Sequence, residues 1–571
     1  MPRDRNDGRE NSTRPRIANE DRLVAMGNSA KRRRRGGARR AAPRKRRWLR
    51  RSLIALGVVI VLVVGAVVGD YYYLGSLVKK VPVKHLQTSS AASENILLIG
   101  STTRCGLKQQ NIAYGLCSQG VTGVNSDIDM VLHLDPATHT VSLLSIPRDT
   151  FVPNARIIGA NKIDAALYEG PSQLITAIEE DFGIPINNYV ELNFDTFANV
   201  VNALGGVKMY FPVPIFDAES GLNIERAGCY DLDGYHALQV VRARHLQIQP
   251  DPSNHDPRSW PFEALSDIAR IRRTHEFLRV LAAKVAARGL GNPLTDQSIL
   301  TAVLPSLTVD SGFTEGKMVS LAETFAHTDI SNVPQYTYPV SDVETGSLLY
   351  QGYYYGDVVF PIEPDGQRAI DTIFGVKPGT SPFSGTTLPA PSSVKLTVEN
   401  GTGVANQAAA ISTPLSADGF NVLSSGTVTP NGPVSETVVW YGGPPPPAHG
   451  NWTSPNLAAA QTVLDQLQGP AVLGYNPSEV TPGATVTIQT GAALSVTPLT
   501  TPTTTTTLAK HPSTTTSTTQ PSTTTTIAGD YTPPGMRNNP DFTTPSSVNP
   551  TLEPWDPRAC NAAGTGPATT P

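Results

Sequence analysis

The stretch TVSLLSIPRDTF, residues 140–151, joins an apolar run to a charged pair. The run is strand-like through Ile146, and Pro147 prevents it from continuing as a regular central strand. Arg148 and Asp149 follow at once, where the strand would meet the edge of a hydrophobic sheet. The sequence therefore predicts a buried strand whose end presents a guanidinium and a carboxylate at the mouth of a pocket.

The sequence around this stretch predicts an α/β domain. Strand and helix patterns alternate over residues 94–380. Residues 130–147 predict two strands joined by a turn, and residues 171–183 and 194–206 predict helices because their apolar side chains recur at helical spacing. These apolar stripes are expected to pack in the core.

The N-terminal region differs sharply in charge from the rest of the 571 residues. Residues 1–51 hold 19 Lys or Arg and 5 Asp or Glu, a net charge of +14, which leaves −17 for the remainder of a chain of net charge −3. An uncharged apolar run then extends from Leu53 to Gly69. We expect a basic, disordered cytoplasmic arm (1–51) and a membrane-spanning helix (52–74).

The alternatives for this region are a cleaved signal peptide and DNA binding by the basic arm. The expected orientation puts a stalk, residues 75–93, and everything after it outside the cytoplasm. The protein would then be a single-pass protein of the cell membrane.

A second, smaller unit follows the first domain. A Pro- and Ser-rich linker, residues 381–392, leads to a small α/β module at 393–490. Residues 491–571 are rich in Thr and Pro, so they are expected to form an extended, disordered tail.

Four cysteines lie beyond the apolar run, where disulfides are chemically permitted: Cys105, Cys117, Cys229 and Cys560. They allow three pairings. Cys105 with Cys117 is the favoured local pair, and the role of a cysteine in the tail stays open.

The stretch HALQVVRARHL, residues 236–246, is interpreted as a strand. Arg242 and Arg244 are two residues apart, which would put both side chains on one face about 7 Å apart. Two guanidiniums side by side repel unless an anion receives them, and their planar forks suit a diphosphate. The alternative is a pair of solvated arginines on an edge strand.

Two further stretches add charged candidates. The predicted helix at 265–289 repeats Asp267, Arg270 and Arg273 along one face, for which a surface ion-pair ladder is the alternative. Asp127 precedes a strand, where it could hold Mg²⁺ between protein and phosphates, and Lys162 could contact phosphate or Asp149.

These pieces converge on an anionic ligand. One acidic region supplies six cations as candidate diphosphate ligands: Arg148, Lys162, Arg242, Arg244, Arg270 and Arg273. The sequence contains no P-loop, no GxSxG motif and no His spacing typical of a metal site. Because ATP is not available outside the cell, a lipid-linked diphosphate is the expected substrate.

The order of the motifs resembles the LytR-CpsA-Psr (LCP) family of cell-wall phosphotransferases. The matching runs cover residues 94–290 and are NILLIGSTTR, NSDIDMVLHL, VSLLSIPRDTFVP, NKIDAAL, GCYDLDGYHALQVVRARHL and DIARIRRTHEFL, with NYVELNFDTFANVVNALGGVKMYFP between the fourth and fifth. The 393–490 module resembles the LytR C-terminal domain of actinobacterial members.

The resemblance implies a central mixed sheet flanked by helices, and a transferase that moves a glycopolymer from a polyprenyl diphosphate carrier to a peptidoglycan hydroxyl. Arabinogalactan would fit the actinobacterial style as the glycopolymer. The partners would be the lipid-linked polymer, peptidoglycan and the membrane, with no nucleic acid.

The resemblance also implies roles for single residues. Arg148, Arg242, Arg244 and Arg270 match diphosphate-binding arginines, and Asp127 matches a metal-binding aspartate for Mg²⁺ or Mn²⁺. Asp149, Lys162 and Asp267 match supporting polar residues. The expected catalytic set is therefore Arg148, Asp127, Asp149 and Asp267, with Asp127 or Asp149 as the general base.

Three departures from the family pattern affect the region around the metal. Thr102 replaces an acidic residue of the frequent GSDSR motif, Asn125 replaces the arginine of RSD, and Thr274 with His275 replaces a frequent Gln pair. Two rival functions stay open. One is a non-catalytic lipid- or wall-binding protein, and the other is a transcriptional regulator acting through the basic arm.

Overall fold

The structure is a computed structural model of the chain. It describes residues 73, 75–88, 93–105, 107, 116–264, 266–288, 301, 304–325, 328–329, 333–343, 348–428, 436–452, 454–496, 536–538 and 551–568. The predicted basic arm and nearly all of the predicted membrane helix lie outside these residues. Among the helices that the structure describes, none combines the length and apolar character needed to cross a membrane.

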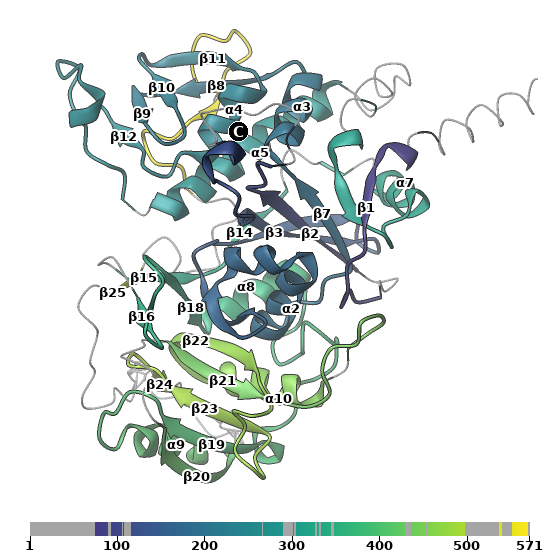
Figure 1. The fold of residues 1–571 in the computed structure, drawn as a ribbon, viewed down its shortest axis with the longest axis vertical. Coiled ribbons are helices and arrows are strands. Elements are labelled where there is room, and N and C mark those ends of the chain that lie inside the picture. Colours follow the sequence, from purple (N-terminus) through teal and green to yellow (C-terminus); the bar gives the residue numbers. More distant parts are fainter. Residues whose placement is uncertain are drawn as a thin grey trace, which may run out of the picture. The chain divides into compact units, whose positions relative to one another are not determined.

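A seven-stranded mixed sheet forms the centre of the first domain (Figure 1). In spatial order its strands are β1 (Lys79–Val81), β13 (Thr308–Asp310), β7 (Asn188–Leu192), β2 (Glu94–Ser101), β3 (Ser126–Asp135), β4 (Thr140–Ile146) and β14 (Gln335–Thr337). β2, β3 and β4 are antiparallel neighbours, whereas β7 runs parallel to β2 and β14 parallel to β4. The predicted α/β class, mixed sheet and strand–turn–strand at residues 130–147 are therefore confirmed.

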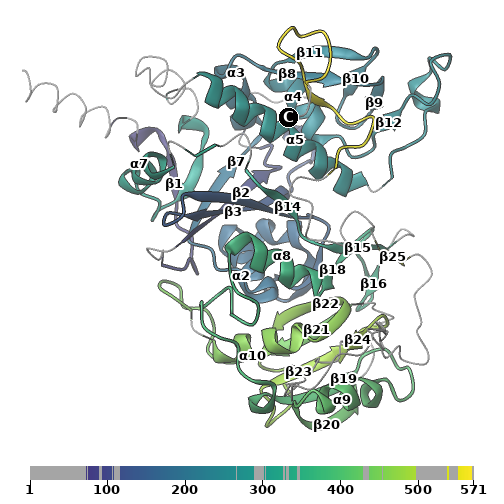
Figure 2. The same cartoon turned by 180° about the vertical axis from the view of Figure 1, so that it is seen from behind.

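Helices cover both faces of this sheet, as Figure 2 shows from behind. α2 (Pro171–Phe182) and α8 (Asp365–Phe374) pack with Leu97, Val131 and Leu144 in one core. α7 (Glu315–Thr324) packs near Ile96 of β2 in another. α2 ends at Gly183, as the sequence indicated. Its φ of +65° is a left-handed backbone conformation, which glycine adopts without the steric cost of a Cβ atom.

A third core lies among α3 (Phe194–Ala203), α4 (Gly234–Arg242), α5 (Ser266–Arg288) and two small sheets. One sheet has the order β10 (Leu222–Ile224), β9 (Ile215–Asp217), β12 (Gln247–Ile248), and the other β11 (Gly228–Leu232), β8 (Val207–Phe211), β26 (Arg558–Ala559). The hairpin β5 (Phe151–Arg156) and β6 (Gly159–Lys162) follows the charged pair directly.

The C-terminal module contributes most of a larger sheet. Its strands are β19 (Lys395–Asn400), β20 (Asn421–Thr427), β21 (Thr437–Tyr441), β22 (Leu467–Tyr475), β23 (Val486–Thr490) and β24 (Ser495–Val496), with helices α9 (Gln407–Ala417) and α10 (Pro455–Leu464). The sheet continues through β18 (Val359–Glu363), β15 (Val340–Val343) and β25 (Met536–Asn538). A separate small hairpin is formed by β16 (Leu349–Tyr350) and β17 (Tyr353–Tyr354).

The module and the expected stalk both pair with strands of the first domain. β22 of the module pairs with β18 through Ile362 and Pro470, so hydrogen bonds join the two units of sequence into one sheet. Residues of the expected stalk form β1, which pairs with β13. The exposed-stalk interpretation failed there because a three-residue edge strand carries too few residues to show a period.

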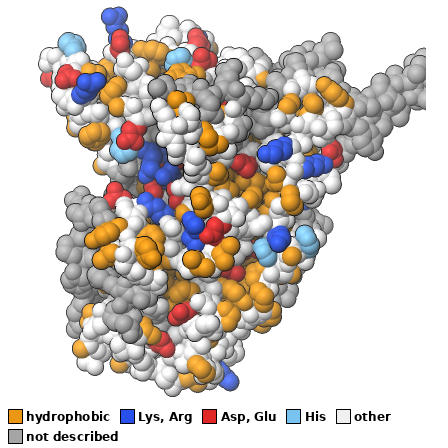
Figure 3. Space-filling view, viewed as in Figure 1, with side chains coloured by type: hydrophobic (Ala, Val, Ile, Leu, Met, Phe, Trp, Pro, Cys, Tyr) orange, Lys and Arg blue, Asp and Glu red, His pale blue; other side chains and the backbone are white. Residues whose placement is uncertain are grey.

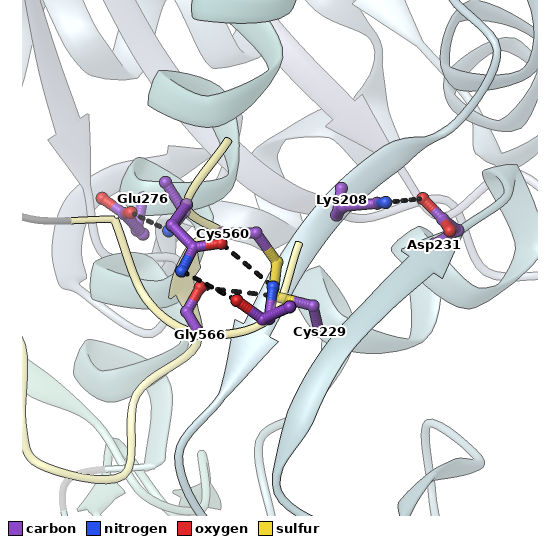
Figure 4. Close-up of a disulfide and its surroundings, with 9 residues drawn as sticks. Lys208, Cys229, Asp231, Glu276, Cys560 and Gly566 are labelled. Atoms are coloured by element: carbon purple, nitrogen blue, oxygen red, sulfur yellow. Dashed lines mark hydrogen bonds and ion pairs between the residues drawn. A yellow bond between two sulfur atoms is a disulfide. The ribbon is translucent and has the colours of Figure 1, made fainter. Parts of the chain in front are cut away.

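The last part of the tail is ordered, whereas the sequence predicted a disordered tail to residue 571. Residues 551–568 pair with β8 through β26, and Cys560 forms a disulfide with Cys229 of β11 (Figure 4). Cys105 and Cys117 form the other disulfide, as expected. The prediction missed this segment because it follows a Thr-rich stretch, whose composition is typical of disorder. That stretch separates the segment from the domain that it joins.

Candidate active site

A polar cavity of about 310 Å³ opens where β3 begins and β4 ends, near α4 and α5. Its lining includes five arginines and two carboxylates: Arg104, Arg148, Arg242, Arg244, Arg270, Asp127 and Glu219. Blue side chains gather in a hollow on one face of the molecule in Figure 3. The structure therefore brings four of the six predicted diphosphate ligands together around one space.

Arg148 is surrounded by carboxylates at this cavity. It forms a short ion pair with Asp127, and its guanidinium nitrogens lie 3.2 Å from Asp164 and 3.7 Å from Asp149. Burial alone would lower the pKa of Arg148, but Asp127, Asp164 and Asp149 raise it above its usual value. Arg148 therefore stays charged and held in place although its side chain is only 18% exposed.

Asp149 contacts two other cations. Lys162 Nζ lies 2.9 Å from Oδ1 of Asp149, and Arg244 forms a short ion pair with Oδ2. The expectation that Asp149 contacts Lys162 is confirmed. Lys162 itself does not line the cavity, so it acts on Arg244 and Arg148 only through Asp149.

Asp267 connects two arginines of the cavity. Its Oδ1 accepts a hydrogen bond from Arg270 Nε at 3.0 Å and lies 3.3 Å from Arg244 Nε. Burial would raise the pKa of Asp267, but Arg270, Arg244 and Arg148 lower it below its usual value. Asp267 is therefore ionised and positions Arg244 and Arg270.

Two arginines share one aromatic ring at the other side of the cavity. Arg242 lies 4.6 Å and Arg104 5.7 Å from the ring centroid of Phe194. Burial, and next the charge of Arg242, lower the pKa of Arg104. An anion between these two guanidiniums would relieve their repulsion.

Sequence reasoning did not select Arg104 or Asp164 as site residues. Arg104 ends the GSTTR run after β2, and β2 is the neighbour of β3 in the sheet. Because β2 and β3 are antiparallel, the end of β2 and the start of β3 lie at one sheet edge, and the position of Asp127 there could have identified Arg104. Asp164 lies in the 3-10 helix at Ile163–Glu169 and had no such signal.

The predicted strand at residues 236–246 is wrong. The segment forms α4, which begins after Asp233 caps it and ends at Arg242, with Ala243 extended and Arg244 beyond it. The apolar residues have helical as well as alternating spacing, so the period was ambiguous. Arg242 and Arg244 still reach one cavity because the chain leaves the helix between them.

Arg273 is not brought to the cavity, contrary to its selection as a diphosphate ligand. Its side chain is fully buried, forms a short ion pair with Glu263, and donates a hydrogen bond to the carbonyl oxygen of Ala243 at 2.6 Å. Three residues after Arg270, it lies a helical turn further on, facing the third core rather than the cavity. Its role is structural.

An apolar cavity of about 200 Å³ adjoins the polar one. The two cavities share Asp127, Arg242 and Arg270. The other lining is largely hydrophobic and comes from β2, β3, β7, α3, α4 and α5: Leu98, Ile99, Ile128, Met130, Leu192, Phe194, Phe197, Leu238, Val241 and Leu278. Charged and apolar walls thus meet at one line of residues, as an amphiphilic ligand requires.

The oxygen ligands near Asp127 suit a cation only in part. Among the residues that the structure describes, no three His, Cys, Asp or Glu side chains cluster as a metal site. Thr102 Oγ1 accepts a hydrogen bond from Asn125 N at 2.9 Å, so the two departures from the family pattern contact each other. Asp127 remains as one carboxylate, which fits Mg²⁺ where substrate phosphates and water complete the coordination.

Comparison with known proteins agrees with this geometry. The LytR_cpsA_psr family model matches residues 73–358, half of the chain. The chain belongs to this family. A second model, described as LytR cell envelope-related transcriptional attenuator, matches residues 393–493.

Two relatives of this chain have names that describe a role in building the cell wall. The chain is 35% identical over 229 residues to the probable cell wall biosynthesis protein LcpB of Corynebacterium glutamicum, covering 40% of this chain and 50% of the relative. It is 31% identical over 207 residues to the polyisoprenyl-teichoic acid–peptidoglycan teichoic acid transferase TagV of Bacillus subtilis, covering 35% and 51%. The chain spans about half the length of these relatives.

Solved structures share lower similarity. The LytR-Csp2A-Psr enzyme from Actinomyces oris is 22% identical with a TM-score of 0.38, covering 46% of this chain and 87% of that one. A structure titled TagT bound to LI-WTA is 21% identical with a TM-score of 0.31, covering 48% and 92%.

Proposed function

We propose that this family member transfers a glycopolymer from a polyprenyl diphosphate carrier to a hydroxyl of peptidoglycan, forming a phosphodiester. The observation that carries the proposal is the junction of the two cavities at Asp127, Arg242 and Arg270. A diphosphate suits the arginines, and a hydrocarbon chain suits the apolar walls next to them. The name of the relative TagV, a teichoic acid transferase, supports a transfer reaction of the same class.

The arginines supply the electrostatic part of the mechanism. Arg148, Arg244 and Arg270 are held in place by carboxylates before substrate arrives, so their reorganisation costs little during reaction. They would stabilise negative charge that develops on the diphosphate while a sugar hydroxyl attacks the sugar-side phosphorus in line. The bond to polyprenyl phosphate then breaks, and polyprenyl phosphate leaves.

Asp127 is the better of the two candidate bases because it lines the polar cavity, whereas the buried Asp149 has both oxygens in ion pairs. In the other role that the resemblance implies, the same carboxylate would hold Mg²⁺, or Mn²⁺, whose charge would help to neutralise the diphosphate. A carboxylate bound to a metal is a weak base, so the two roles of Asp127 are alternatives.

We propose a single-pass membrane protein with the domain outside the cytoplasm. The support is compositional, from the basic arm and the apolar run at 53–69.

The test is an assay of the full-length protein in detergent with a polyprenyl diphosphate oligosaccharide, a peptidoglycan acceptor and Mg²⁺. Release of polyprenyl phosphate together with a new phosphodiester on the acceptor is the expected result. Binding of the lipid without any release would instead favour the non-catalytic binding protein. Binding of DNA with sequence preference would favour the regulator.

Replacing Asp127 by asparagine is expected to raise the Mg²⁺ concentration for half-maximal turnover about tenfold or more, because a neutral amide holds a divalent cation less well than a carboxylate. The measurement is a Mg²⁺ titration of turnover after treatment with EDTA. Asp231→Asn is the control, since that carboxylate is 81% exposed on β11. An unchanged Mg²⁺ dependence would remove Asp127 as the metal ligand.

A further inference from the structure

A cavity of about 660 Å³ lies apart from the arginine cavity and shares no lining residue with it. One wall comes from the β5–β6 hairpin and α2, and the other from β21, β22 and β23 of the C-terminal module. The polar and aromatic residues that matter are Asn154, Gln173, Glu180, Trp440, Tyr475 and Gln489.

Hydrogen bonds between the two walls preform this cavity. Asn154 Nδ2 donates to the carbonyl oxygen of Tyr475 at 2.9 Å, and Tyr475 N donates to Asn154 Oδ1 at 3.0 Å. The hydroxyl of Tyr441 donates to the carbonyl oxygen of Glu180 at 2.9 Å. The two walls therefore need little rearrangement to receive a ligand.

The carboxyl group of Glu180 is available to a ligand at the cavity wall. The residue is only 4% exposed, and among the described residues none donates a hydrogen bond to its carboxyl. Burial raises the pKa of Glu180 to about 8, so the group is mostly neutral at pH 7. A neutral carboxyl can both donate to and accept from a hydroxyl group.

The charge of the lining separates this cavity from the arginine site. Among the described residues of its lining, the one cation, Arg156, is already paired with Glu169 at 2.8 Å, and Glu479 is the other charged residue besides Glu180. The remaining polar lining is largely amide, and Trp440 and Tyr475 add aromatic surface. Such a lining suits a neutral ligand with many hydroxyls and apolar ring faces, and disfavours a phosphate.

The β5–β6 hairpin runs from beside the arginine site toward the second cavity. At its base Phe151 pairs with Lys162, which contacts Asp149, and at its tip Arg156 pairs with Gly159 at the second cavity. A strand of six residues spans about 20 Å. A sugar chain anchored by its phosphate at Arg148 would therefore reach the second cavity after several rings.

We propose that this cavity binds a neutral oligosaccharide. The occupant is a stretch of glycan from either the transferred polymer or the peptidoglycan acceptor, and this assignment of source rests on the proposed function. The C-terminal module then acts as one wall of a saccharide subsite rather than as an independent unit.

The test is calorimetric titration of the full-length protein in detergent with two probes, chitotetraose for the acceptor strand and a galactan tetrasaccharide for the transferred polymer. Binding of at least one probe is expected, and the preferred probe identifies the source. Ala160→Trp puts a bulky ring into the lining and is expected to weaken binding roughly tenfold or more. Ala137→Trp, the same change in the exposed β3–β4 turn, is the matched control and should bind as wild type.

Gln489→Ala provides a second variant that removes an amide without adding bulk, and it should also weaken binding. Thermal unfolding of each variant shows whether it is folded. The proposal is overturned if neither probe binds, or if folded Ala160→Trp and Gln489→Ala bind as tightly as wild type. Lack of lipid diphosphate turnover by the wild-type protein would overturn the proposed function but not saccharide binding, so the two failures are distinguishable.

Discussion

Replacing Arg148 by alanine is expected to lower the rate of transfer by about 10²–10³, the loss seen when one preorganised electrostatic stabiliser is removed. Arg148 lies at the meeting point of Asp127, Asp149 and Asp164, and it lines the polar cavity. The measurement is release of polyprenyl phosphate under saturating lipid diphosphate, which separates the effect on kcat from the effect on KM.

Arg148→Lys is the informative companion variant. Lysine keeps the positive charge but loses the planar fork that contacts two oxygens at once, so an intermediate loss is expected. Lys208→Ala is the control, because Lys208 is 48% exposed and pairs only with the exposed Asp231. Wild-type turnover by Arg148→Ala would show that the polar cavity is not the reaction site.

The stability of Arg148→Ala should also depend on pH differently from the stability of the wild type. Burial raises the pKa of Asp164 to about 6, while Arg148 opposes that rise. A folded-state pKa above the unfolded value means that this carboxyl costs stability as pH increases. Without Arg148 the pKa of Asp164 rises further, so the deficit in stability relative to wild type should be larger at pH 8 than at pH 5, as thermal unfolding at both values would measure.

Strong local signals made much of the fold predictable from sequence. The apolar runs around residues 130–147 and the glycine-terminated helix at 171–183 each carry a clear period and a stop signal, and both are confirmed. α4 failed because nine residues rich in apolar side chains fit both periods. β1 was not predicted because it is only three residues long and is defined by a long-range pairing with β13, which has no local sequence signal.

The candidate site was predictable where a charged residue lies at the end or the start of a strand. Arg148 comes just after β4 and Asp127 lies at the start of β3, and both line the cavity. Arg273 shows the limit, because a helix face does not reveal whether an arginine meets a ligand or a buried glutamate. Its partner Glu263 lies before the helix begins, and a second carboxylate, Asp556, is nearly 300 residues away in the chain.

Replacing Asp556 by alanine is expected to destabilise the catalytic domain strongly, by about 3–5 kcal/mol, the typical cost of leaving a buried charge without its partner. Asp556 is fully buried, and its Oδ2 lies 2.5 Å from Arg272 Nε. Arg272 and Arg273 would then share the single carboxylate of Glu263. Two buried guanidiniums beside one carboxylate leave a net positive charge in the third core.

The neighbourhood of Asp556 explains why the loss should reach the active site. Asp556 pairs with Arg272 and Ala559 N donates to Glu276 at 3.1 Å, so the C-terminal segment contacts α5 at more than one point. Trp555 Nε1 also donates to Glu263, just before this helix, at 2.7 Å. The same helix carries Arg270 into the polar cavity, together with Asp267, which positions Arg270 from behind. Thermal unfolding and hydrogen exchange of α5 would measure the effect, and both should change in Asp556→Ala.

The matched control for this prediction is Asp231→Ala, which removes an ion-paired carboxylate that is 81% exposed. An exposed pair contributes about 1 kcal/mol or less, so the control should unfold close to wild type. Asp556→Asn keeps the shape and a hydrogen-bond acceptor for Arg272, and it should be less unstable than Asp556→Ala. If Asp556→Ala unfolds at the wild-type temperature with unchanged exchange in α5, the C-terminal segment is only tethered by Cys560 and does not complete the buried network, and Glu263 alone would balance both arginines.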